Sequence, residues 1–187
     1  RELRAGFAEV IKYGLLGDRD FFEWLEANGK NVLALDDAAI AHAVFTSCAA
    51  KARIVEADER EAGQRALLNL GHTFAHAFEA EAHYDGRLLH GEAVAAGMGL
   101  AFDLSVELNI CNGQDARRCK AQLEASGLPS GLSNLPAGQA SAETLLRHMK
   151  HDKKVKDGTM HFVLVRSIGD AFVSGDVPPE TVLALLE

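Results

Sequence analysis

The chain has 187 residues, of which 48% are hydrophobic and only 6% aromatic, and its formal net charge is −8. This length suits a single domain, and a hydrophobic content with so few aromatic residues favours packed helices over a sheet sandwich. The negative charge argues against a nucleic-acid partner or an anionic membrane surface, so an anionic substrate would need a local basic cluster.

The cysteines and the apolar runs of the sequence indicate in which cellular compartment the protein works. Cys48, Cys111 and Cys119 form no CxxC pair, which predicts reduced thiols, a cytoplasmic location and no thiolate zinc site. No uninterrupted apolar run reaches the roughly 18 residues that a membrane span needs. The sequence opens within a helical pattern, RELRAGFAEVIKYG, so we expect a piece of a longer polypeptide. No strand–glycine-loop–helix unit is present, which argues against a dinucleotide site in these residues.

Three helices are predicted in the first third of the chain, over 2–16, 19–28 and 36–58. In the third, Asp36 or Asp37 is a suitable N-cap, and we expect Ile40, Val44 and Cys48 to line its buried side. In the first helix, Glu9 and Lys12 are three residues apart and share a face. They form either a surface ion pair of little energetic weight or part of a site.

The most informative stretch is RALLNLGHTFAHAFE at 65–79. If residues 65–82 form one helix, then Arg65, Asn69, His72 and His76 fall within a wedge of roughly 60° at about 100° per residue. A face of one cation, one amide and two imidazoles differs from a solvated face of Lys and Glu. We therefore expect this face to line a polar cavity and the opposite, Leu- and Phe-rich face to pack in the core.

The rest of the chain predicts four more helices and one hairpin. A helix from His90 is crowded with Gly and Ala, which indicates a central helix packed closely on its neighbours or on a ligand. The helices are expected over 90–110, 112–126, 142–151 and 179–186, and the two strands over 159–165 and 171–173. The predicted fold class is mainly α, a single domain over 1–187 with a short β-hairpin near the C-terminus.

Glutamate and histidine are suitable ligands for a catalytic zinc ion, and the candidates are Glu9, His72, His76 and His90. His72 and His76 have the spacing of an HExxH metalloprotease, but the glutamate of that motif is missing, which argues against a protease. A lone histidine is usually a hydrogen-bonded core residue. Two on one face, with Arg65 and Asn69, favour a site. Lys51 lies among alanines and either snorkels at the surface or reaches into a cleft.

Four segments together resemble the 3-dehydroquinate synthase family. They are RAGFAEVIKYG at 4–14, KARIVEADEREAGQRALLNLGHTFAHAFE at 51–79, LLHGEAVAAGM at 88–98 and DKK at 152–154. They occur in order along nearly the whole chain and are long and specific. Ala75 stands where the family more often has glycine, and Gln64 is at a variable position. Neither departure affects the expected site. The resemblance implies the mainly helical C-terminal domain of the enzyme, without its NAD-binding N-terminal domain.

The resemblance also implies a function. The family converts 3-deoxy-D-arabino-heptulosonate 7-phosphate, a phosphorylated sugar acid, to 3-dehydroquinate and phosphate in the shikimate pathway, and the full-length enzyme is typically a homodimer. It uses NAD, bound mainly by the N-terminal domain, and a divalent metal, zinc or cobalt. By motif position, the implied metal ligands are Glu9, His72 and His90. The implied substrate contacts are Lys12, Lys51, Arg65, Asn69, His76 and one of Lys153 and Lys154, with Lys12, Arg65 and His76 also in catalytic roles.

Two alternatives stay open from the sequence. Related sugar-phosphate cyclases share the metal triad and differ in residues that contact the substrate. A non-catalytic, helical metal-binding module would fill every coordination position with protein side chains, which could include His76, whereas a catalytic site keeps one position open.

Overall fold

The computed structural model describes residues 1–59, 63–136, 140–151 and 160–187, and the mainly helical fold predicted from the sequence is confirmed. In chain order, the helices and strands that it describes are α1 (Glu2–Gly17), α2 (Arg19–Leu33), α3 (Asp37–Ala57), the 3₁₀ helix η1 (Gln64–Asn69), α4 (His72–Glu81), α5 (His90–Glu107), α6 (Gly113–Ala125), the 3₁₀ helix η2 (Leu132–Asn134), α7 (Ala142–His151), β1 (Phe162–Ser167), β2 (Asp170–Ser174) and α8 (Pro179–Leu186).

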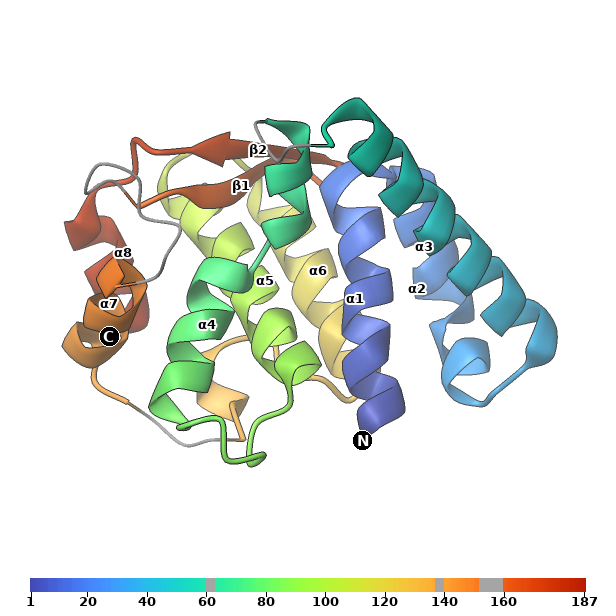
Figure 1. Cartoon of the computed structure of the whole chain (residues 1–187), viewed down its shortest axis with the longest axis horizontal. Coiled ribbons are helices and arrows are strands. Elements are labelled where there is room, and N and C mark those ends of the chain that lie inside the picture. The colour runs from blue at the N-terminus through green and yellow to red at the C-terminus, as the bar shows by residue number, and fades with distance from the viewer. Residues whose placement is uncertain (60–62, 137–139, 152–159) are drawn as a thin grey trace.

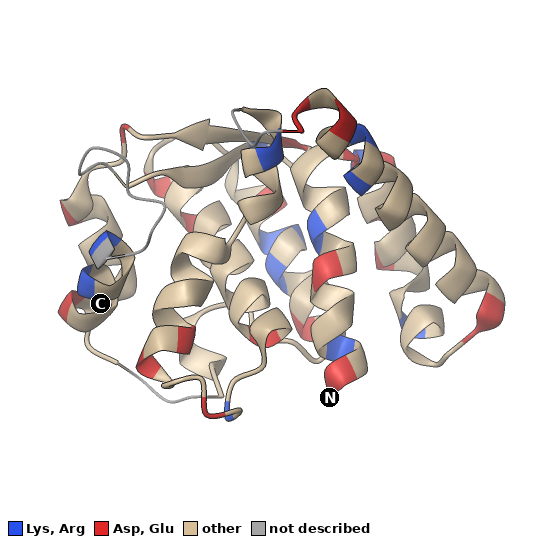
Figure 2. Ribbon diagram, viewed as in Figure 1, with Lys and Arg blue, Asp and Glu red and all other residues tan. Residues whose placement is uncertain are grey.

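The helices form an elongated array around α5 (Figure 1). Helices α1, α4 and α6 pack directly on α5, with α2 and α3 beyond α1 and with α7 and α8 at the opposite end. The antiparallel hairpin β1–β2 runs along one long edge of the array, across the ends of the helices (Figure 1), and packs on α5 and α1. Acidic and basic residues are interspersed along the ribbon (Figure 2).

Helix α5 is central because its small residues let neighbouring backbones approach. Every residue from Gly91 to Phe102 is buried. A Cβ atom at Gly91 would lie 1.9 Å from the carbonyl oxygen of Ala5 in α1, and one at Gly99 would lie 1.9 Å from that of Ser130. The close packing that the glycines predicted is therefore confirmed, and it holds the first turn of α5 against α1.

The prediction of one continuous helix over 65–82 is wrong. The chain forms the 3₁₀ helix η1, then breaks at Leu70 and Gly71, and α4 begins at His72. Gly71 adopts a left-handed conformation, with φ of 81°, which glycine reaches at little cost. A Cβ atom there would also lie 2.7 Å from the backbone nitrogen of Met98 in α5. Arg65 and Asn69 therefore belong to a different element from His72 and His76.

Helix α3 begins where predicted, with the Asp36 side chain accepting a hydrogen bond from the Ala39 backbone, but its buried side is not the predicted one. Val44 is 52% exposed and Cys48 is exposed, whereas Ala43 and Ser47 are buried. By length and composition alone α3 is apolar enough to cross a membrane, with 22% of the relevant window buried, and a single such helix is weak evidence for a membrane span. All three cysteines are free.

Candidate metal centre

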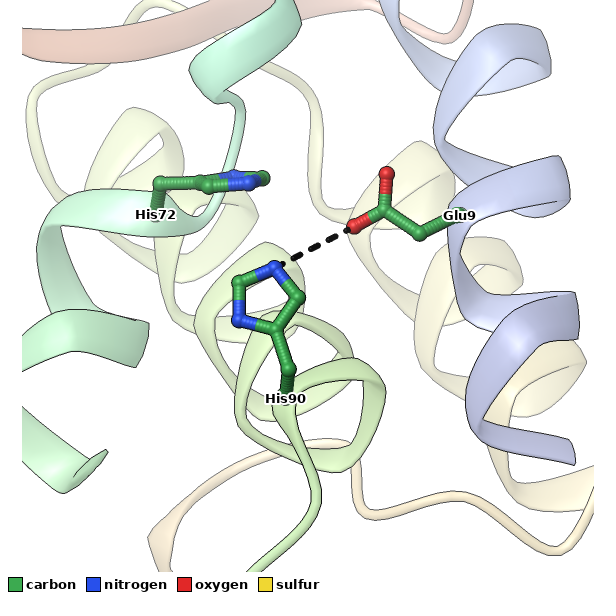
Figure 3. Close-up of side chains that lie close together, drawn as sticks. All are labelled: Glu9, His72 and His90. Carbon is green, nitrogen blue, oxygen red and sulfur yellow. Dashed lines mark ion pairs between the residues drawn. The ribbon is translucent and has the colours of Figure 1, made fainter. Parts of the chain in front are cut away.

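Three elements bring Glu9, His72 and His90 together. Glu9 lies midway along α1, His72 is the first residue of α4, and His90 is the first residue of α5. Each offers one ligand atom, and these atoms all lie within 4.8 Å of one another. Figure 3 shows the carboxylate and the two imidazole rings pointing toward a common space. The packing of α1 and α4 on α5 thus brings together residues that are up to 81 positions apart in the sequence.

One carboxylate oxygen of Glu9 has no hydrogen-bond partner among the described residues. Its Oε2 accepts a hydrogen bond from the Lys12 ammonium at 2.6 Å, but Oε1 is buried and accepts none. This Oε1 lies 3.8 Å from Nε2 of His90. Two ligand atoms of one tetrahedral zinc ion lie about 3.4 Å apart, so the spacing of these two atoms fits a shared cation. The cation would also give the buried carboxylate oxygen the positively charged partner that it needs.

Hydrogen bonds on the far side of both rings fit the same arrangement. Nδ1 of His72 lies 3.2 Å from the Leu70 carbonyl oxygen, and Nδ1 of His90 lies 3.0 Å from Oε1 of Glu79. Both partners accept hydrogen bonds, so in the neutral form of each ring Nδ1 carries the proton and Nε2 keeps its lone pair. The Glu79 carboxylate raises the pKa of His90. The donor set of two imidazoles and one carboxylate is a common one for catalytic zinc.

The cation beside this cluster is unusually buried. The Lys12 side chain is 4% exposed, and burial lowers its pKa although the Glu9 carboxylate opposes that shift. Lys51, an exposed residue of α3, lies near enough to lower the pKa of Lys12 further by repulsion. The Glu9–Lys12 pair is therefore not a solvated surface ion pair, and a second positive charge, that of Lys51, lies near the Lys12 ammonium.

The other predicted residues take different positions. His76 is half-buried one turn beyond His72, with its ring centroid 5.7 Å from that of His72, and it is not a member of the three-residue cluster. Arg65 in η1 donates a hydrogen bond from its guanidinium to the Glu59 carbonyl at 3.0 Å. Asn69 is half-buried at the end of η1, which packs on α1 and α3. Lys153 and Lys154 lie outside the described residues.

Sequence reasoning missed Glu79. Its side chain is 13% exposed and contacts His90 across the interface between α4 and α5. A signal was present, because Glu79 follows His72 by seven residues, and this spacing returns to the same helix face after two turns. The partner of Glu79 lies beyond the loop that follows α4, so the helical pattern gave no indication of the contact.

The sequence matches the family described as 3-dehydroquinate synthase C-terminal over residues 6–155. Proteins named 3-dehydroquinate synthase from Ruegeria pomeroyi, Rhodospirillum rubrum and Cereibacter sphaeroides are 52%, 53% and 54% identical over 187 residues. All of this chain is covered in each comparison, and the chain spans about half the length of these curated relatives (50%, 49% and 50%).

Solved structures share the fold. A 2-epi-5-epi-valiolone synthase of Streptomyces hygroscopicus, with NAD⁺ and Zn²⁺ bound, superposes with a TM-score of 0.85 at 26% identity, over 98% of this chain and 50% of that one. A 2-deoxy-scyllo-inosose synthase gives a TM-score of 0.73 at 20% identity, over 100% of this chain and 51% of that one, and at that identity the likeness concerns the fold alone.

Proposed function

We propose a function from the premise that this chain belongs to the 3-dehydroquinate synthase C-terminal family. The chain supplies the metal- and substrate-binding half of an enzyme that converts 3-deoxy-D-arabino-heptulosonate 7-phosphate to 3-dehydroquinate and phosphate. The observation that carries the proposal is the buried Oε1 of Glu9, which accepts no hydrogen bond from the residues that the structure describes and lies within the Glu9–His72–His90 cluster. Relatives with the synthase name are 52–54% identical, against 26% for the valiolone synthase, which favours this substrate over those of the other cyclases.

The proposed cofactors are a divalent metal held by Glu9, His72 and His90, and NAD bound mainly outside these residues. The NAD⁺ and Zn²⁺ in the valiolone synthase structure support both. When bound, the metal would act as a Lewis acid and template for substrate oxygens. A cytoplasmic location and a homodimeric full-length enzyme are parts of the same proposal.

The remaining residues hold and position the substrate. Lys12 and Lys51 provide point charges for its anionic groups, and Arg65 provides a bidentate fork. A buried ammonium group such as that of Lys12 gains most from an anionic partner, because there is little water to compete with it. Asn69 and one of Lys153 and Lys154 add further contacts. His76 is the proposed group that transfers a proton to or from the substrate, the role that a positioned imidazole most often has in general acid–base catalysis.

Zinc titration tests the proposed metal centre. We expect the metal-stripped chain to bind one zinc ion in isothermal titration calorimetry, because all three proposed ligands lie within it. Binding should be lost in His72→Ala. The matched control is His83→Asn, since His83 is exposed with φ of 55° and asparagine tolerates that backbone region. Absence of zinc binding, or undiminished binding by His72→Ala, would contradict the proposal.

The coordination number separates a catalytic site from a purely structural one. X-ray absorption on the zinc-loaded chain should show two imidazoles, one carboxylate and at least one non-protein oxygen ligand. Three imidazoles with the carboxylate would mean that His76 completes the shell, and the chain would then be a non-catalytic metal-binding module.

The zinc-loaded chain by itself is expected to release no phosphate from substrate in the presence of NAD. These residues contain no glycine-rich loop that could bind the dinucleotide. The oxidation of the substrate would therefore lack NAD as its hydride acceptor. A phosphate-release assay with full-length 3-dehydroquinate synthase of Ruegeria pomeroyi as positive control measures this. Steady phosphate release by the chain alone, above a no-enzyme blank, would refute the prediction.

A further inference from the structure

The candidate site has a second carboxylate, Glu79, which is not among the proposed metal ligands. Glu79 lies on α4, and its side chain is largely shielded from solvent at 13% exposure. Its Oε1 accepts a hydrogen bond at 3.0 Å from Nδ1 of His90 in α5. The other ring nitrogen of His90, Nε2, is directed at Glu9 (Figure 3). The imidazole is thus held between two carboxylates that come from two different helices.

The two contacts of His90 are not equivalent. The distance from Nδ1 to Glu79 is that of a hydrogen bond, whereas the 3.8 Å from Nε2 to Oε1 of Glu9 is too long for one. A neutral imidazole has one proton, and the arrangement places it on Nδ1, which leaves the Nε2 lone pair facing the cluster. Rotation of the ring by half a turn would place carbon atoms, Cδ2 and Cε1, where Nδ1 and Nε2 now lie, and would lose the hydrogen bond to Glu79.

His90 needs such a support more than His72 does. The His90 side chain is 50% exposed at the start of α5, so packing restricts its rotamer less than it would restrict that of a buried ring. His72 is half-buried, and its Nδ1 contacts the backbone carbonyl of Leu70, an acceptor fixed by the turn that contains Gly71. The contact with Glu79 gives the exposed histidine an equivalent acceptor from a neighbouring helix.

We propose that Glu79 is a positioning residue, which fixes the tautomer and the orientation of His90 so that its Nε2 faces the metal centre. The inference rests on the proposed metal site and concerns a residue outside the Glu9–His72–His90 set. Carboxylate partners of ligating histidines orient the ring and raise its basicity, and their loss typically costs about 10- to 100-fold in metal affinity.

The test compares zinc affinity in the wild type, Glu79→Ala and Glu79→Gln, by competition with a chromophoric chelator. We expect Glu79→Ala to weaken binding about 10- to 100-fold. Glu79→Gln should weaken it less, because an amide oxygen still accepts a hydrogen bond. The matched control is Glu81→Gln, on the same helix, which removes the charge of a carboxylate that contacts a different histidine, His148, at 3.1 Å. It should leave the affinity unchanged.

A second readout separates positioning from a general structural role. In the metal-free chain, at a pH where His90 is neutral, nitrogen-15 NMR should show the proton of His90 on Nδ1 in the wild type and a mixture of tautomers in Glu79→Ala, with an unchanged circular dichroism spectrum. A wild type with the proton on Nε2 would overturn the inference, as would unchanged zinc affinity in Glu79→Ala. Failure of the wild type to bind zinc would instead refute the metal site, and the inference with it.

Discussion

Replacing His90 by alanine is expected to weaken zinc binding roughly 100- to 1,000-fold. Structural zinc sites with four protein ligands bind zinc with roughly 10–16 kcal/mol in total. One ligand therefore contributes about 3–4 kcal/mol, and about 1.4 kcal/mol is a factor of ten in affinity. The helical content should stay nearly unchanged. His90 begins α5 with a half-exposed side chain, and its contacts are with Glu79 and Glu9 and with the ring of His72 rather than with the hydrophobic core. The fold is held instead by the apolar interface of α5 with α1, α4 and α6, which this substitution does not touch.

Chelator competition measures the affinity, and far-ultraviolet circular dichroism of the metal-free variant measures the helical content. The matched control is His148→Ala, which removes another half-exposed histidine that contacts a glutamate, Glu81, at 3.1 Å. The His148→Ala variant should lose a histidine–glutamate contact like that of His90 and keep its full affinity for zinc. Collapse of the helical signal in His90→Ala alone would make His90 a structural residue and would remove the basis for a pre-formed metal centre.

The order of the helices could be predicted because their signals are local. Asp36 caps α3 and Ser141 caps α7, each accepting a hydrogen bond from the backbone three residues later, and both caps can be recognised in the sequence. The glycines of α5 likewise indicated a central helix. The residues of the candidate metal centre were predicted by resemblance, and their spatial proximity arises from contacts between helices that no periodicity describes.

Two features were beyond local reasoning. The break at Gly71 occurs where the backbone of α5 comes so close that a Cβ atom would lie 2.7 Å from the backbone nitrogen of Met98, and Met98 is more than twenty residues away in the sequence. In α3, both sides of the helix are apolar, and the buried one carries Ala43 and Ser47 while Val44 and Phe45 are exposed. Small residues allow closer packing of helices, and hydrophobicity alone ranks the two sides the other way.

The second large effect concerns Gly97, where α5 meets the turn before His72. A Cβ atom at this position would lie 2.1 Å from the carbonyl oxygen of Gly71. Both partners are backbone atoms within packed elements, so the overlap is relieved only by moving α4 away from α5. Overpacking of this kind costs about 1–3 kcal/mol, occasionally more. Gly97→Ala is therefore expected to lower the free energy of unfolding by about 2 kcal/mol, against a gain of up to about 1 kcal/mol in helix propensity.

Urea unfolding of the metal-free chain measures this, with Gly6→Ala as the matched control. Gly6 lies on the exposed side of α1, and a Cβ atom there would meet nothing within 4 Å, so alanine at this position should raise the free energy of unfolding by up to about 1 kcal/mol. Because Gly71 directly precedes His72, the displacement in Gly97→Ala should also weaken zinc binding, whereas Gly6→Ala should leave it unchanged. Equal stability of the two variants would contradict close backbone packing of α5 on the turn at Gly71, and with it the role of that turn in fixing the position of His72.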